Sequence, residues 1–167
     1  MPEREVIVNK KRINYEGLFD SKGVYKIIED YFDGLNYDKV EKKNIEVVKP
    51  EGKYVEILLE PYKKISDYIK VIVKIRMIIS DLKEIEIERE KKKVKINQGN
   101  LQIIIDGYYE TDHQNKWQAN PIRYFIRTCF NKYFFKPYTK QGFGNVSNDI
   151  SGLVTKLQRY LNTFRNF

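Results

Sequence analysis

The segment from residue 67 to residue 80 constrains the fold more than any other part of the chain. Apolar side chains occupy every second position there, at Ile69, Val71, Val73, Ile75, Met77 and Ile79. Lys70, Lys74 and Arg76 fall between them. Alternation of this kind places the apolar side chains on one face of a strand and the charged ones on the other. The segment therefore predicts a central antiparallel strand with one buried and one solvated face.

Other segments with strand character lie on both sides of this one. The pattern predicts strands over residues 13–19, 40–48, 53–60, 84–90, 94–96 and 101–109. Turn signals separate several of them: Pro50-Glu51-Gly52 precedes the strand that Pro61 ends, and Asn97-Gln98-Gly99-Asn100 precedes the last strand. The sequence thus predicts a meander of about seven antiparallel strands.

Three segments have helical periodicity. The first runs from about Lys22 to Asp33, with Ser21 as its N-cap and Gly34 at its end. The second begins with Asn120 as cap and Pro121 in the first turn, and it ends at Lys136-Pro137. A glycine-bearing loop over residues 141–145 then leads to a third helix that Ser147 caps. We expect the apolar stripes of all three helices to face the sheet.

These elements predict an α+β protein. One antiparallel sheet of about seven strands is expected to carry the N-terminal helix, after the first strand, and two C-terminal helices, all packed on one face. Residues 1–12 are interpreted as a polar N-terminal arm and residues 13–167 as a single domain, since 167 residues suffice for one hydrophobic core.

The order of elements over residues 13–165 resembles the helix-grip or START-like fold, in which a curved sheet wraps a long C-terminal helix. The resemblance lies in element order and not in any motif, so no site residue is carried over. It implies a carrier of a hydrophobic small ligand held between sheet and helix. One departure is that this chain offers two C-terminal helices joined by a loop. The chain is also similar in character to small archaeal proteins, which implies no mechanism.

Charge is distributed very unevenly along the chain. Residues 1–112 hold 22 Lys or Arg and 22 Asp or Glu, whereas residues 113–167 hold 9 Lys or Arg against Asp149 alone. The whole formal charge of +8 therefore belongs to the last third. Such a local excess favours an anionic or acidic partner, although codon bias toward lysine explains part of the basicity.

The sequence gives few signs of catalytic or metal chemistry. It has one histidine and one cysteine, Cys129, which excludes a multi-His/Cys zinc site, a Cys-X-X-Cys redox pair and an internal disulfide. Cys129 is expected to be a buried structural thiol. The acidic cluster Asp106, Glu110 and Asp112, with His113 beside it, is the best catalytic candidate, but Asp106-Gly107 is typical of a bend. We expect no cofactor and no resident metal.

The candidate binding residues lie on the predicted C-terminal helices. Tyr124, Arg127, Asn131 and Phe135 form a second helix face whose composition is typical of an interface. The remaining candidates add positive charge: Arg123, Lys136, Lys140, Lys156 and Arg159. Basic and aromatic side chains together suit nucleic acid, although no RNA- or DNA-binding motif is present. The alternative is that the Tyr124/Phe135 face is interior, or that it joins copies of the chain.

The sequence therefore predicts a non-enzymatic binding or assembly protein whose basic C-terminal segment docks RNA, DNA or an acidic protein surface. A START-like carrier and a self-assembling structural protein are the alternatives. The single cysteine and the absence of a leader-like start or an apolar span predict a cytoplasmic protein that does not cross a membrane.

Overall fold

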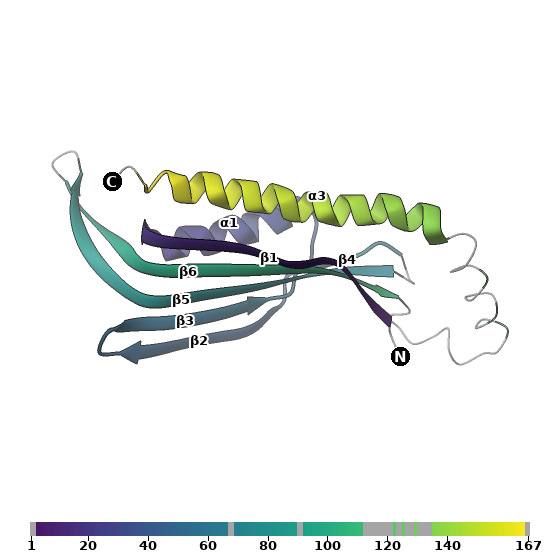
Figure 1. Ribbon diagram of the computed structural model, residues 1–167, viewed down its shortest axis with the longest axis horizontal. Coiled ribbons are helices and arrows are strands. Elements are labelled where there is room, and N and C mark those ends of the chain that lie inside the picture. Colours follow the sequence, from purple (N-terminus) through teal and green to yellow (C-terminus); the bar gives the residue numbers. More distant parts are fainter. Residues whose placement is uncertain are drawn as a thin grey trace.

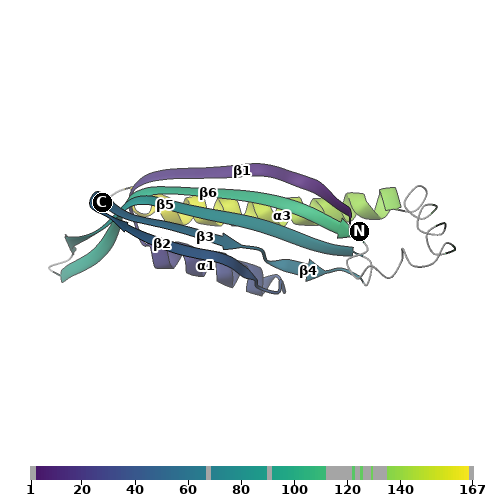
Figure 2. The same cartoon turned by 90° about the horizontal axis from the view of Figure 1, so that it is seen from below.

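The computed structural model describes residues 3–66, 69–89, 92–111 and 135–165, together with Ile122, Phe125 and Cys129. Six strands of these ranges form one antiparallel sheet. They are β1 (Glu3–Phe19), β2 (Glu41–Lys49), β3 (Gly52–Leu59), β4 (Tyr62–Lys64), β5 (Ile69–Arg89) and β6 (Lys92–Thr111). The order across the sheet is β1-β6-β5-β3-β2, and β4 pairs with β5 beside this path. β1 and β2 are therefore the two edges, as Figure 2 shows.

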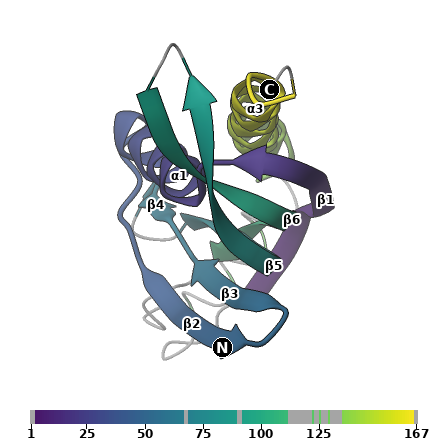
Figure 3. The same ribbon diagram turned by 90° about the vertical axis from the view of Figure 1, so that its left-hand side faces the viewer.

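Two helices, α1 (Ser21–Gly34) and α3 (Phe135–Asn162), lie on the same face of the sheet (Figures 1 and 3). They contact each other at glycines. A Cβ at Gly23 would collide with the Tyr160 hydroxyl, and a Cβ at Gly152 would collide with the Tyr31 hydroxyl. The two glycines therefore let large tyrosine side chains of one helix pack against the backbone of the other. Among the described residues, no helix is both long and apolar enough to cross a membrane.

The α+β class is confirmed, but the expected seven strands and three helices are wrong. The described residues form six strands and two helices. The described residues of the segments 67–80 and 84–90 belong to one strand, β5, and the segments 94–96 and 101–109 are parts of β6. The structure also joins residues 3–12 to the first strand, because β1 begins at Glu3. The short strand β4 was not predicted.

A bulge explains why the expected turn at residues 97–100 is instead part of a strand. The pairing of β5 with β6 shifts between Ser80 and Lys83, and Asp81 has a φ of 56°. Gly99 lies opposite this irregularity, where a Cβ would come within 2.9 Å of the Ser80 carbonyl oxygen. Gly99 thus allows two backbones to approach, and the hairpin continues beyond the bulge with a bend (Figure 1).

The expectation that the segment 67–80 forms a central strand is confirmed for its described residues, which begin at Ile69. β5 lies between β6 and β3, and Val71, Val73 and Ile75 are almost completely buried beneath the helices. Arg76, on the opposite face, keeps nearly half of its side chain exposed. Ile72 on that face is buried as well, so the outer face is only partly wet.

The first helix agrees with the sequence pattern except at its ends. Val24, Ile28 and Phe32 are buried as their spacing predicts. Asp20, and not Ser21, is the N-cap, because its carboxylate accepts a hydrogen bond from the Lys22 amide. Gly34 is the last helical residue, and Leu35 is the C-cap.

The C-terminal helix is longer than predicted. α3 passes through Gly142, Gly144 and Ser147 without a break, so the expected loop at 141–145 and the expected cap at Ser147 are wrong. A glycine in a helix costs about 1 kcal/mol, less than the burial of the apolar stripe provides. That stripe is buried as predicted, at Ile150, Leu153, Val154, Leu157 and Leu161.

Candidate basic face

The nine binding residues predicted from sequence fall into three groups. Arg123, Tyr124, Arg127 and Asn131 lie outside the described residues, as do Asp112 and His113. Phe135, Lys136 and Lys140 fall in the first turns of α3, where the structure describes the backbone. Lys156 and Arg159 lie on the last turns of α3 and are exposed. The structure therefore places two of the predicted cationic side chains on one helix, and the Tyr124/Phe135 face stays a prediction.

The outward face of α3 is made of basic and small polar side chains. Its exposed residues are Asn145, Asn148, Ser151, Thr155, Lys156, Gln158, Arg159 and Asn162. We call this set the basic face. It contains no carboxylate. The exposed residues of α1 differ, because Lys22 and Lys26 share that surface with Asp30 and Asp33.

The single acid of α3 is held in the contact between the helices. Tyr37, which follows α1 and is almost completely buried, donates a hydrogen bond of 2.8 Å from its hydroxyl to Asp149 Oδ2. Burial and this bond raise the pKa of Tyr37 well above its ordinary value. Tyr31 donates a second bond, also 2.8 Å, to the Asp149 carbonyl oxygen. Two tyrosines thus hold Asp149 against α1.

Lys156 lies next to the same contact. Its Nζ is 5.7 Å from the centroid of the Tyr31 ring, within the range of a cation–π interaction. Residues 149 and 156 are two helical turns apart on the same side of α3, so Tyr31 lies between an anionic and a cationic group. The contacts of Tyr31 and Tyr37 with Asp149 could not be predicted, because nothing in a local pattern links them to a helix more than a hundred residues away.

Asp106 and Glu110 of the acidic cluster each bind a group of the edge strand β1, and Asp112 and His113 lie outside the described residues. Asp106 accepts a 2.7 Å hydrogen bond from the Lys10 amide, at the point where β1 bulges and Lys10 has a φ of 48°. Glu110, whose side chain is nearly buried, pairs with Arg4 Nε at 2.7 Å. Both carboxylates therefore hold the edge strand β1 in place. No group of three possible metal ligands occurs in the described parts of the chain.

The apolar residues expected on the inner stripe of the second predicted helix are not all buried. Ile122 and Phe125 are 70% and 69% exposed. The expectation that these two side chains face the core is therefore wrong. Cys129 is partly buried, not fully buried as expected.

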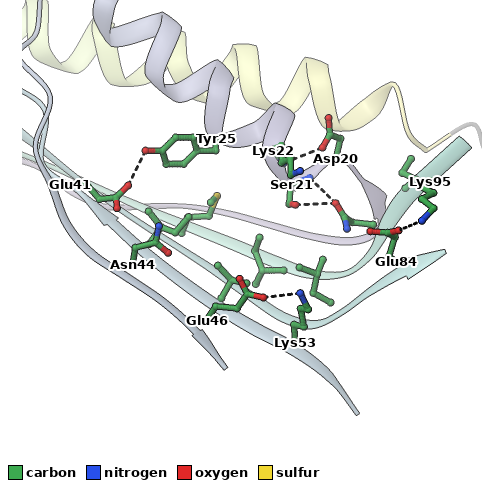
Figure 4. A pocket seen from close by; sticks show the side chains of 17 residues that line it. Asp20, Ser21, Lys22, Tyr25, Glu41, Asn44, Glu46, Lys53, Glu84 and Lys95 are labelled. Atoms are coloured by element: carbon green, nitrogen blue, oxygen red, sulfur yellow. Dashed lines mark hydrogen bonds and ion pairs between the residues drawn. The ribbon is translucent and has the colours of Figure 1, made fainter. Parts of the chain in front are cut away.

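A groove of about 870 Å³ opens between the first turn of α1 and the adjacent strands β2, β3, β5 and β6 (Figure 4). Its rim charges pair among themselves: Glu46 with Lys53 at 2.8 Å and Glu84 with Lys95 at 3.1 Å. The Tyr25 hydroxyl likewise donates to Glu41 at 2.9 Å. Met77 and Ile79 in its floor are already 2% and 1% exposed.

Apart from this groove, buried side chains pack the helices against the sheet. Ile28 and Phe32 of α1, Leu153 and Leu157 of α3, and Ile103 of β6 are each at most 1% exposed. They belong to one apolar core. A START-like carrier would hold its ligand between sheet and helix, and that alternative stays a prediction.

Comparisons with known proteins give no relative for this chain. No protein-family model, no curated protein and no solved structure matches it. These comparisons do not bear on the resemblance to the helix-grip fold, which stays a prediction.

Proposed function

We propose that this protein binds nucleic acid through the phosphate backbone, using the basic face of α3. The observation that carries the proposal is the position of Asp149. This residue is the only acid among residues 113–167, and Tyr37 and Tyr31 hold it toward α1. The outward surface of α3 is therefore left with cations and uncharged polar groups, a composition that attracts a polyanion.

The uncharged residues of the basic face support nucleic acid over an acidic protein. Serine, threonine, asparagine and glutamine donate hydrogen bonds to phosphate oxygens, alongside lysine and arginine, in protein–DNA contacts. The basic face offers Ser151 and Asn148 in addition to Arg159. Contacts of this kind set position and affinity but do not read base sequence, so we expect binding with little sequence preference.

The test is a salt titration with fluorescently labelled single-stranded RNA and duplex DNA, read by anisotropy. Neutralising phosphates releases counterions, so the logarithm of the binding constant should fall linearly with the logarithm of salt concentration. The double variant Lys156→Glu/Arg159→Glu should bind at least tenfold more weakly and with a shallower salt slope. Its fold is checked by circular dichroism.

The matched control is Lys26→Glu/Lys64→Glu, which makes the same charge change at exposed lysines of α1 and β4. It should bind nucleic acid with nearly the affinity of the unmodified protein. Equal losses in both double variants would mean that only net charge matters, and would contradict a role for α3. Salt-sensitive binding to polyglutamate but not to RNA or DNA would replace nucleic acid by an acidic protein partner.

A further inference from the structure

β2 is an edge strand with an open side. Among the described residues it pairs only with β3, and it lies at one end of the sheet. Eight of its nine residues are exposed, the exception being the half-buried Lys43. An edge strand of this kind presents a row of backbone amides and carbonyls that another strand can pair with.

The two edges differ in regularity: β1 is interrupted between Val6 and Lys11, whereas β2 is regular over most of its length. β1 has two shifts of register against β6, at Val6/Val8 and at Val8/Lys11, and the Asp106 carboxylate binds the Lys10 amide within this irregular stretch. Bulges of this kind disturb an edge and prevent further pairing. β2 has one shift, before Lys43, and then pairs with β3 in regular register as far as Lys49.

The regular part of β2 also carries exposed apolar side chains. Ile45 is 38% exposed, Val47 is 42% exposed and Val48 is 73% exposed. Ile45 lies opposite Glu56 and Val47 opposite Tyr54. The buried Ile57 of β3 belongs to the core under the helices, and side chains alternate along a strand, so Ile45 and Val47 are on the sheet face away from the helices. A regular edge with exposed β-branched residues favours strand addition over solvation.

We propose that β2 pairs with β2 of a second copy of this chain, antiparallel and about a two-fold axis at Ile45. In this register Ile45 lies opposite Ile45 of the second copy, and Asn44 lies opposite Glu46, whose carboxylate accepts from the amide. Lys43 lies opposite Val47. The Lys43 ammonium is held by Glu56 at 2.9 Å, which leaves its apolar stem for the valine.

Charge excludes one neighbouring register, and apolar contact disfavours the other. A two-fold axis normal to the sheet keeps every side chain on its own face. The alternative registers are therefore those in which the axis passes through a neighbouring residue. An axis at Glu46 would oppose Glu46 to itself and Lys43 to Lys49. Like charges directly opposite each other destabilise a strand pair.

The axis at Ile45 opposes no like charges between residues 43 and 47. An axis at Asn44 also opposes none, but it would place Ile45 opposite Lys43 and Val47 opposite Glu41. Only the axis at Ile45 brings the two isoleucines together, a favourable cross-strand pair.

Dimerisation through β2 is independent of the proposed function. α3 contacts β1 and β6, which lie at the opposite end of the strand order from β2. The basic face would remain open in a dimer, and a failure of either proposal leaves the other intact.

The first test is sedimentation equilibrium of the full chain over a wide range of concentration. The mass of the unmodified protein should rise with concentration from 20.0 kDa toward twice that value. Val47→Lys should remain monomeric throughout, because it places lysine opposite Lys43 of the second copy. Val94→Lys is the matched control: Val94 is 43% exposed but lies on β6, and this variant should still dimerise.

The second test fixes the register. In a Cys129→Ser background, Ile45→Cys should form a cross-linked dimer under oxidised glutathione. Residues directly opposite in an antiparallel pair have Cα atoms about 4.5–5.5 Å apart, within disulfide range. Val94→Cys should not cross-link. A protein that stays monomeric at every concentration, equal losses in Val47→Lys and Val94→Lys, or a dimer that Ile45→Cys cannot cross-link would overturn the proposal.

Discussion

Tyr37 and Asp149 are joined by a 2.8 Å hydrogen bond between the end of α1 and the middle of α3. The Tyr37 ring also packs edge-on against Phe32, so its hydroxyl reaches the carboxylate from inside the core. This contact affects both the packing of the helices and the charge of the surface. It fixes the packing of the helices, and it holds the only acid of the basic segment against the neighbouring helix.

Tyr37→Phe should lower the free energy of unfolding. The variant keeps the ring and its contact with Phe32 but removes the donor to Asp149, and a hydrogen bond to a charged group contributes about 1.5–3 kcal/mol. Urea denaturation followed by circular dichroism measures the change. Tyr54→Phe is the control, because the Tyr54 hydroxyl lies 3.5 Å from Glu56 and its bond is weak. Similar losses in both variants would contradict this assignment.

Val73→Asp should prevent folding at ordinary temperature. Val73 is fully buried in the central strand β5, and an unpaired carboxylate there costs several kcal/mol, comparable with the whole stability of a small domain. The control is Val48→Asp on β2, where the valine is 73% exposed and the change should stay within about 0.5 kcal/mol. Melting temperatures of the two variants test this prediction. An unchanged melting temperature for Val73→Asp would exclude a buried position for Val73.

Alternation identified β5 as the central strand because burial on one face leaves a period of two in the sequence. The same reasoning failed at Asn97-Gln98-Gly99-Asn100, whose residue types suit a turn as well as a bulge. The difference lies in the strand opposite, at Ser80 and Asp81, which a local pattern cannot include. The pairing of residues 97–100 with β5, distant in the sequence, therefore determines their structure.

Gly99→Ala should destabilise the protein by about 1–3 kcal/mol, the cost of overpacking a tight site. The new Cβ would lie 2.9 Å from the Ser80 carbonyl oxygen, which is backbone and cannot rotate away. Gly34→Ala is the matched control, since no atom lies within 4 Å of a Cβ at that position. It should be neutral or stabilise by up to about 1 kcal/mol. Equal unfolding midpoints in urea would contradict the bulge.

The candidate site could be predicted only in part. The charge asymmetry identified α3, and Lys156 and Arg159 are indeed exposed on it. Two features of the site could not be predicted from the sequence. The glycines at 142 and 144 suggested a loop, whereas α3 continues through them. The orientation of Asp149 depends on Tyr31 and Tyr37, which belong to or follow a helix near the other end of the chain.

Alkaline pH should unfold the protein through its buried tyrosines. Burial, and then the bond to Asp149, raise the pKa of Tyr37 above its ordinary value of 10.0. Burial also raises the pKa of Tyr31, Tyr109 and Tyr160. A raised pKa in the folded state means that the unfolded chain loses its protons first as pH rises. The contribution of these groups is therefore complete below pH 10.0 and is lost progressively above it.

Tyr37→Phe isolates the contribution of one proton to this loss. Between pH 10.0 and its pKa in the folded protein, Tyr37 lowers the free energy of unfolding by about 1.4 kcal/mol per pH unit. The variant should start less stable but lose stability less steeply, by about that amount per pH unit. Urea denaturation at a series of alkaline pH values gives both slopes, and tyrosinate absorbance reports ionisation. Parallel slopes would show that Tyr37 titrates alike in the folded and unfolded chains, which its buried bond to Asp149 should prevent.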